Sequence, residues 1–129
     1  MNVRVAVDAV IEKNGEVLLL KRAVEPFKGW WVLPGGGVKY GEQLVGAVKR
    51  EVKEETGLKV KVLKYLGYYD KPGRDPRGHT ISHAFLCKPI SSKIDGSLEG
   101  REIKWFKKLP KKVGFDHRQI IEDSGVLNA

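Results

Sequence analysis

The chain has 129 residues, the size of one domain with one buried core. Its 24 Lys and Arg against 16 Asp and Glu give a formal charge of +8, which fits nucleic-acid binding, an anionic small ligand or only a solubilising surface. One cysteine excludes an internal disulfide, and no apolar run approaches the roughly 20 residues that span a bilayer. With no signal-peptide pattern either, we expect one domain over 1–129, located in the cytoplasm, with no membrane partner.

The chain is predicted to begin with an antiparallel pair of strands. Aliphatic runs at 3–11 and 16–20 flank Asn14-Gly15, the dipeptide most typical of a two-residue hairpin turn. The segment 24–42 is rich in Pro and Gly, which predicts a loop and a short strand.

The rest of the chain is predicted to alternate helices and strands. A helix over 42–56 is closed by Gly57, and a second helix over 116–123 has Asp116 as its N-cap. Between them the pattern predicts three strands and a loop, at 58–69, 79–90, 101–109 and 71–78 respectively. This order predicts an α/β fold in which helices cover a mixed β-sheet.

Three of the few acids, Glu51, Glu54 and Glu55, lie within five positions of the first predicted helix. At about 100° per residue they share an arc beside an apolar stripe. The stripe consists of Val45, Val48 and Val52. Carboxylates so close repel one another unless a cation intervenes, and Mg²⁺ or Mn²⁺ favours such oxygen ligands. The helix therefore indicates either a divalent-metal site at the edge of the core or an ordinary solvated face.

The spacing around these acids matches a known motif. From residue 36 to 58 the sequence GGVKYGEQLVGAVKREVKEETGL has every position of the Nudix box, namely Gly36, Glu42, Arg50, Glu51, Glu54, Glu55 and Gly57 with aliphatic residues between and after them. The chain therefore resembles the Nudix hydrolases, and the similarity extends over nearly its whole length. It implies an α/β/α sandwich and hydrolysis of a nucleoside diphosphate linked to another group.

The resemblance also implies roles for the residues of the box. Glu51, Glu54 and Glu55 become ligands of Mg²⁺, for which Mn²⁺ is a possible substitute, and Glu54, Glu55 and Arg50 become catalytic. Glu42 pairs with Arg50 to orient these ligands and reaches a metal ion through water. Gly36 supplies the turn of backbone beside the substrate. The family resemblance further leads us to expect a homodimer.

The substrate is predicted from the loop GRDPRGH at 73–79. Arg74 and Arg77 could direct guanidinium groups at phosphate oxygens, with His79 beside them, or form a solvated turn in which Asp75 pairs with an arginine. The loop resembles that of ADP-ribose pyrophosphatases, and of related Nudix domains that bind ADP-ribose. The similarity implies hydrolysis of ADP-ribose to AMP and ribose 5-phosphate.

Other candidate residues are assigned less directly. Arg22 is a further phosphate contact. The adenine could stack on one of five aromatic residues, Phe27, Trp30, Trp31, Tyr68 or Tyr69. Because family members often use a late glutamate as general base, Glu99 is favoured over Asp95 and Glu102. The histidines are predicted to be structural or to contact substrate, and they are His79, His83 and His117.

Two classes of function remain open from the sequence. The first is a hydrolase of ADP-ribose, of another nucleoside diphosphate derivative or of a nucleoside triphosphate. The second is a non-catalytic module that binds ADP-ribose or a nucleic-acid end, for which the basic charge is the support. A complete set of box carboxylates favours the hydrolase, so we expect a small nucleotide as the partner and no specific nucleic acid.

Overall fold

A computed structural model of the chain describes residues 2–95 and 101–127. Within these residues one sheet has the order β3-β2-β1-β6-β5, with β4 added to β1 and β7 added to β2. The strands are β1 (Arg4–Lys13), β2 (Glu16–Lys21), β3 (Trp31–Val32), β4 (Gly35–Gly37), β5 (Val60–Tyr69), β6 (Thr80–Pro89) and β7 (Ile103–Phe106). Because β1 and β6 run parallel while the other pairs run antiparallel, the sheet is mixed as predicted.

The predicted hairpin is confirmed between β1 and β2. Asn14 has a φ angle of 53° and Gly15 one of 76°, and the tight turn between the strands requires positive values at both positions. The strands extend to the turn itself, since Lys13 pairs with Glu16.

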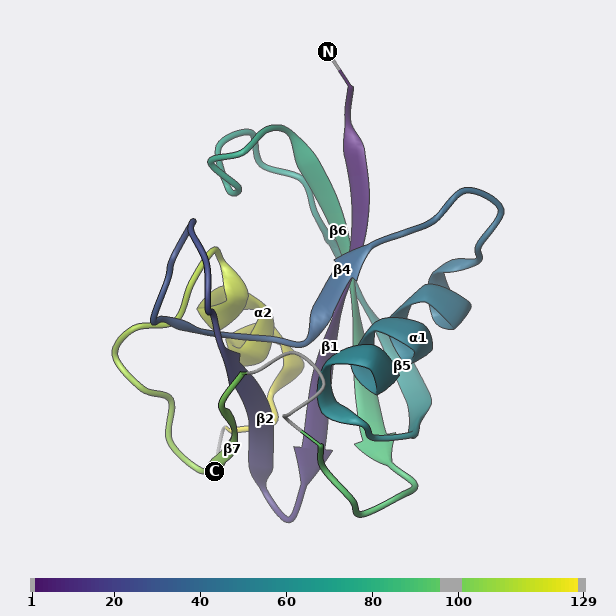
Figure 1. The fold of residues 1–129 in the computed structure, drawn as a ribbon, viewed down its shortest axis with the longest axis vertical. Helices are drawn as coiled ribbons and strands as arrows, with labels where there is room; N and C mark the ends of the chain where they lie inside the picture. Colours follow the sequence, from purple (N-terminus) through teal and green to yellow (C-terminus); the bar gives the residue numbers. More distant parts are fainter. Residues whose placement is uncertain (1, 96–100, 128–129) are drawn as a thin grey trace.

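Two helices cover opposite faces of the sheet, α1 (Leu44–Thr56) and α2 (His117–Ser124), and Figure 1 shows them on either side of β1. Alternate residues of β1 serve the two faces, because successive strand side chains point in opposite directions. Val7, Ala9 and Ile11 pack in one cluster with Ala47, Val48 and Val52 of α1. Val10 packs in the other cluster with Ile120 and Ile121 of α2. The α/β/α sandwich predicted from the sequence is therefore confirmed.

Several predicted boundaries and side-chain environments differ from the structure. The first helix begins at Leu44 rather than at Glu42, and Val45 is 42% exposed instead of buried with the apolar stripe. The last strand is shorter than predicted, since β7 covers four residues of the run at 101–109. Asp116 precedes α2 but its carboxylate makes no capping hydrogen bond, because it binds Arg74 instead.

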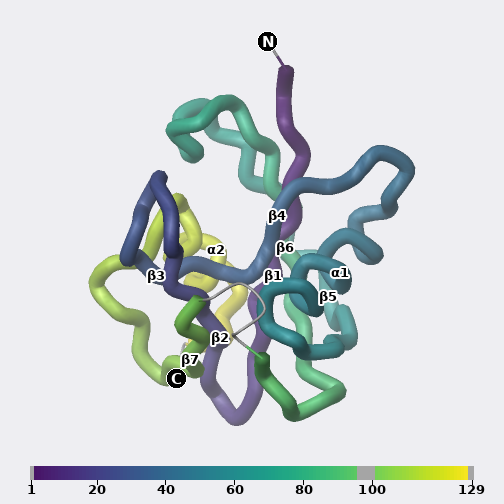
Figure 2. The backbone as a smooth tube through the Cα atoms, in the orientation of Figure 1, coloured from purple at the N-terminus to yellow at the C-terminus, as the bar shows by residue number. Residues whose placement is uncertain are grey.

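The loops that matter for function leave the sheet at one end. Figure 2 shows the segments 22–30 (dark blue) and 71–79 (teal) on the same side of β1 as α2. Residues from both segments line one cavity. No helix within 2–95 and 101–127 is long and apolar enough to cross a membrane.

Candidate active site

A cavity of about 370 Å³ lies where β1, β4 and β6 meet the two helices. Gly35, Gly36 and Gly37 of β4 form part of its wall, and Glu51 and Glu55 of α1 face it from beside that strand. The cavity therefore brings together the glycine-rich strand and two of the three acids predicted from the sequence.

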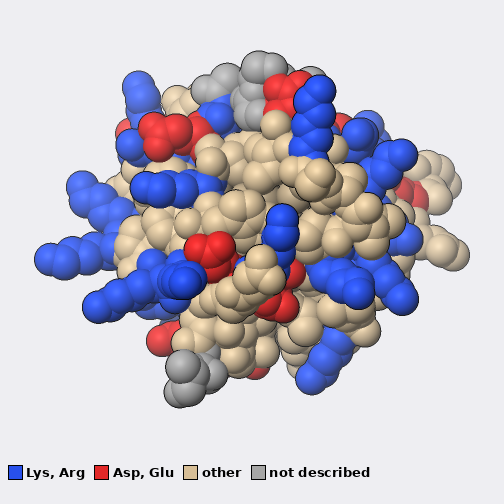
Figure 3. Space-filling view, turned by 90° about the horizontal axis from the view of Figure 1, so that it is seen from below, with Lys and Arg blue, Asp and Glu red and all other residues tan. Residues whose placement is uncertain are grey.

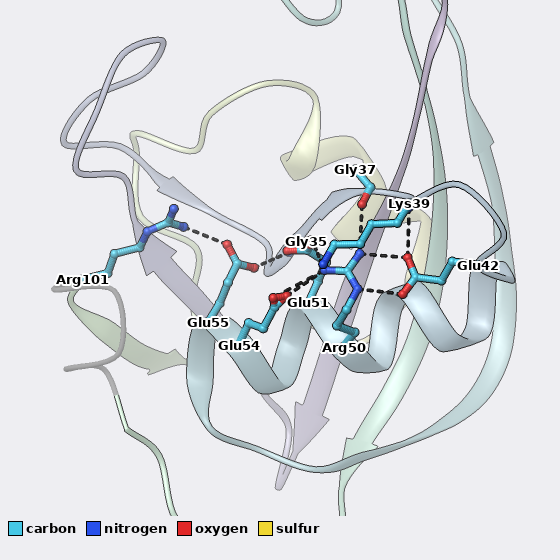
Figure 4. Close-up of polar contacts among 9 residues, drawn as sticks. All are labelled: Gly35, Gly37, Lys39, Glu42, Arg50, Glu51, Glu54, Glu55 and Arg101. Atoms are coloured by element: carbon cyan, nitrogen blue, oxygen red, sulfur yellow. Dashed lines mark hydrogen bonds and ion pairs between the residues drawn. The ribbon is translucent and has the colours of Figure 1, made fainter.

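Arg50 is the centre of the ionic network on α1, shown in Figure 4. Its Nε and Nη2 donate to the two carboxylate oxygens of Glu42, at 2.6 and 2.9 Å, and Nη2 also donates to the carbonyl of Gly37. Its Nη1 donates to Glu51 at 2.8 Å and to Glu54 at 2.7 Å. Arg50 thus makes the contact with Glu42 that the sequence predicted, and it also ties together two predicted metal ligands.

The contact with Arg50 perturbs the carboxyl group of Glu42. The hydrogen bonds from Arg50 lower the pKa of its carboxyl group from 4.5 to about 2, and the backbone N–H of Lys39 adds to the effect. The same contact raises the pKa of Arg50. Glu42 is consequently ionised at neutral pH and engaged by Arg50, and it does not belong to the wall of the cavity formed by the described residues.

Glu55 is held from the other side of the helix. Its Oε1 accepts the backbone N–H of Gly35 at 2.8 Å, and its Oε2 accepts Nη1 of Arg101 at 2.9 Å. Only 7% of the Glu55 side chain is exposed, so these contacts offset the cost of burying its charge. Figure 4 shows Arg101 approaching Glu55 from the side opposite to Arg50.

The donor set fits a divalent metal ion by its chemistry. Glu51 and Glu55 offer hard oxygen ligands to one cavity, and a Cβ atom added at Gly36 would lie 2.6 Å from the Glu51 carboxyl carbon. Glycine is therefore required at position 36 to leave the carboxylate its place. Glu54 lies outside the wall and pairs with Arg50, and no three acids, histidines or cysteines within the described ranges converge as a ready-made metal cage.

Guanidinium groups also line the cavity. Arg22, Arg77 and Arg101 all belong to its wall. Partial burial lowers the pKa of Arg22, and the positive charges of Arg77 and Arg101 lower it further. A wall with several neighbouring cations attracts an anionic ligand, and guanidinium groups suit phosphate oxygens in particular.

Arg74 has buried contacts within the protein that the sequence did not predict. Its side chain is only 4% exposed, and it donates from Nε and Nη2 to both carboxylate oxygens of Asp116 and from Nη1 to the hydroxyl of Ser82. Arg74 thus docks the loop onto α2 and β6, and it also belongs to the wall of the cavity. Arg77 pairs with Asp75, the alternative noted from the sequence, but remains 48% exposed at the cavity.

Several other candidates lie away from this cavity in the described parts of the chain. His79 approaches the carbonyl of Asp70, and Phe27 and Trp30 pack against each other. None of the three lines the cavity wall, nor do Trp31, Tyr68, Tyr69, His83, Asp95 or Glu102. Glu99, the predicted general base, lies outside the described residues.

The structure adds residues that sequence reasoning did not select. Phe115 is the aromatic side chain of the cavity wall beside His117, and its ring lies 5.3 Å from the Arg22 guanidinium. Asp8 also lines the cavity, and its Oδ2 has no hydrogen-bond partner within the described ranges. A charged residue inside the apolar run VAVDAVI was the signal for Asp8, whereas no sequence pattern indicated Phe115.

His117, the first residue of α2, lines this cavity and lies beside Asp8 of β1. Its Nδ1 accepts the backbone N–H of Leu33 at 2.9 Å, and burial lowers its pKa. Because Nδ1 accepts, the neutral ring carries its proton on Nε2, which faces Asp8 Oδ1 at 3.5 Å. The prediction that His117 is structural or contacts substrate fits this position.

Comparison with known proteins places the chain in a family. The family model of the NUDIX domain matches residues 2–123. The chain belongs to the NUDIX family. An ADP-ribose pyrophosphatase of Methanocaldococcus jannaschii is 49% identical over 121 residues, which cover 92% of this chain and 71% of that protein. The chain spans 52–57% of the length of several other relatives.

Solved NUDIX structures share the fold over nearly the whole chain. A MutT NUDIX hydrolase of Burkholderia pseudomallei has a TM-score of 0.86 and 29% identity, with 95% of this chain and 98% of that chain covered. The NUDIX domain of Shewanella oneidensis NrtR, complexed with ADP ribose, has a TM-score of 0.81 and 26% identity, with 96% and 87% covered.

Proposed function

We propose that this NUDIX protein is a Mg²⁺-dependent pyrophosphatase that hydrolyses ADP-ribose to AMP and ribose 5-phosphate. The observation that carries the proposal is the cavity lined both by two acids of the Nudix box, Glu51 and Glu55, and by the guanidinium groups of Arg22 and Arg77. Acids that suit a metal ion and arginines that suit phosphate are the two halves of a diphosphate site. The 49% identical relative named for this activity supports the substrate.

In this proposal each residue has a defined task. Glu51 and Glu55 hold the metal ion, with Glu54 as a third candidate once it leaves Arg50, while Arg50 and Glu42 fix the carboxylates. A bound Mg²⁺ would neutralise diphosphate oxygens and lower the pKa of a coordinated water molecule. Mn²⁺ would substitute, because it favours the same oxygen ligands.

The direct test is hydrolysis of ADP-ribose with Mg²⁺, followed by chromatography of the products. We expect AMP and ribose 5-phosphate, and we expect Glu55→Gln to lower kcat/KM by about 100-fold or more. Lys49→Gln, on an exposed position of the same helix, is the matched control and should retain activity. If another nucleotide is cleaved and ADP-ribose is not, the substrate assignment is wrong while the hydrolase remains.

A second candidate is a domain that binds ADP-ribose without hydrolysing it. It is favoured by one observation, the NUDIX domain of NrtR solved with ADP ribose bound. Calorimetry with ADP-ribose in the presence of Mg²⁺ separates the two functions. Saturable binding with no AMP after prolonged incubation would support the binding domain over the enzyme.

A further inference from the structure

The acids of the Nudix box are divided between two arginines that approach from opposite sides. Arg50 binds Glu51 and Glu54, at 2.8 and 2.7 Å, and Arg101 binds Glu55 at 2.9 Å (Figure 4). Each carboxylate therefore has a guanidinium partner where the proposed function requires a metal ion. This division matches the finding that no three of these acids converge within the described residues.

Arg101 differs from Arg50 in its place relative to the cavity. Arg50 also binds Glu42 and the carbonyl of Gly37, and it does not line the cavity. Arg101 lines the cavity together with Glu55, and its side chain is 18% exposed. A ligand entering the cavity can thus reach Arg101 directly.

Both proposed ligands, the divalent cation and the diphosphate, compete with the contact between Arg101 and Glu55. A guanidinium bound to the carboxylate repels a divalent cation that approaches the same oxygens. Arg101 also lies near enough to Arg22 for its charge to lower the pKa of that residue. An anionic ligand between these arginines relieves their mutual repulsion, so a diphosphate competes with Glu55 for Arg101.

We propose that Arg101 is a positioning residue that exchanges partners, neutralising Glu55 in the metal-free protein and binding the diphosphate once a divalent cation holds Glu55. The proposal rests on the proposed function, because it takes a metal ion and a diphosphate as the two ligands of the cavity. Its consequence is that removing the charge of Arg101 changes the affinities for these ligands in opposite directions.

The experiment uses Arg101→Met, which keeps a long side chain and removes the charge. Mn²⁺ binding without nucleotide, measured by calorimetry, should become about fivefold tighter or more, because one positive charge leaves Glu55. Binding of inorganic pyrophosphate, measured at a Mg²⁺ concentration that saturates the protein so that a cation holds Glu55, should become about tenfold weaker. A purely structural role would weaken both.

Two further variants make the result specific. Arg101→Lys keeps the charge and should hold Mn²⁺ affinity near that of the wild type. Arg101→Gln, which is also uncharged, replaces Arg101→Met if that variant does not fold, with the same expected shifts. Arg22→Met is the matched control, because Arg22 lines the same cavity but donates its Nε to the carbonyl of Pro26. It should weaken pyrophosphate binding with a smaller effect on Mn²⁺.

The outcomes are distinct from those of the hydrolysis assay. Unchanged or weaker Mn²⁺ binding by Arg101→Met overturns the competition, and unchanged pyrophosphate binding overturns the exchange of partners. If the wild-type protein does not hydrolyse ADP-ribose but the two affinities shift in opposite directions, the proposed substrate fails and the role of Arg101 is retained.

Discussion

Arg74 and Arg77 are three residues apart in one loop, yet their side chains have different environments. Arg74 is almost fully buried and binds both oxygens of Asp116, whereas Arg77 is half-exposed at the cavity, with Asp75 as its partner. Burial makes the first contact important for stability, because removing one member of a buried ion pair leaves the other unpaired. Exposure leaves the second guanidinium accessible to a ligand.

We therefore predict that Arg74 contributes mainly to the stability of the fold and Arg77 mainly to ligand binding. Arg74→Met should lower the free energy of unfolding by about 2 kcal/mol, because the Asp116 carboxylate loses its partner. Arg77→Met should lower it by about 1 kcal/mol, since the buried Asp75 carboxylate keeps the backbone N–H of residue 77 and the nearby positive charge of Arg4. Urea titration monitored by circular dichroism measures both values.

The two variants should also differ in ligand binding. Arg77→Met should weaken pyrophosphate binding by about tenfold, while folded Arg74→Met should bind nearly as the wild type does. Equal losses of stability in the two variants, or a binding defect confined to Arg74→Met, would contradict this assignment of roles.

An ion pair between Glu42 and Arg50 connects helix α1 to the segment that precedes it. Glu42 lies two residues before the helix, and its bidentate contact with Arg50 connects the end of the glycine-rich segment to the second turn of α1. The spacing from Glu42 to Arg50 lies within one local motif, which is why the sequence predicted this contact. The start of the helix at Leu44 was not predicted, because Gln43 provides no capping hydrogen bond to mark it.

We predict that this contact makes the stability of the fold depend on acid pH. The pKa of Glu42 is about 2 in the folded protein against an ordinary value of 4.5, so the unfolded chain binds the proton first as the pH falls. The stabilisation is therefore complete above about pH 4.5 and is lost as the pH falls towards 2. Glu42→Gln should reduce the decline of unfolding free energy over this range, as measured by urea titration between pH 2.5 and 6.

The control for this prediction is the same substitution in an Arg50→Met background. Without the guanidinium, Glu42→Gln should change the pH dependence of the unfolding free energy much less, because only the backbone N–H of Lys39 still lowers the pKa of Glu42. A difference of the same size in both backgrounds would mean that another group perturbs Glu42.

The sequence predicted the structural features that depend on local spacing and missed those that depend on tertiary contacts. The hairpin and the shared arc of acids on the first helix follow from patterns within about two turns or two strands, and the sandwich was implied by the resemblance to the Nudix hydrolases. In contrast, Arg74 meets Asp116 across 42 positions, and Arg101 meets Glu55 across 46. No periodicity relates such pairs, so the buried role of Arg74 and the contact of Arg101 became visible only in the folded chain.

The net positive charge of the protein is dispersed over its surface. Figure 3 shows Lys and Arg spread around one face of the molecule, with acids and uncharged residues between them. A dispersed charge of +8 attracts polyanions weakly and is screened over about 8 Å at physiological salt. The arginines of the cavity are closer together and partly buried, so salt screens them less.

We therefore predict different salt dependences for nucleic acid and for ADP-ribose. Fluorescence anisotropy with a single-stranded RNA 20-mer should show binding at low salt that is lost near about 150 mM NaCl, because released counterions dominate such binding. Calorimetry with ADP-ribose in a chelator should show a smaller loss of affinity over the same range, about tenfold or less. Excess ADP-ribose should not displace the RNA if the two ligands occupy different surfaces. RNA binding that persists above this salt concentration and is displaced by ADP-ribose would instead identify the arginine-lined cavity as a nucleic-acid site.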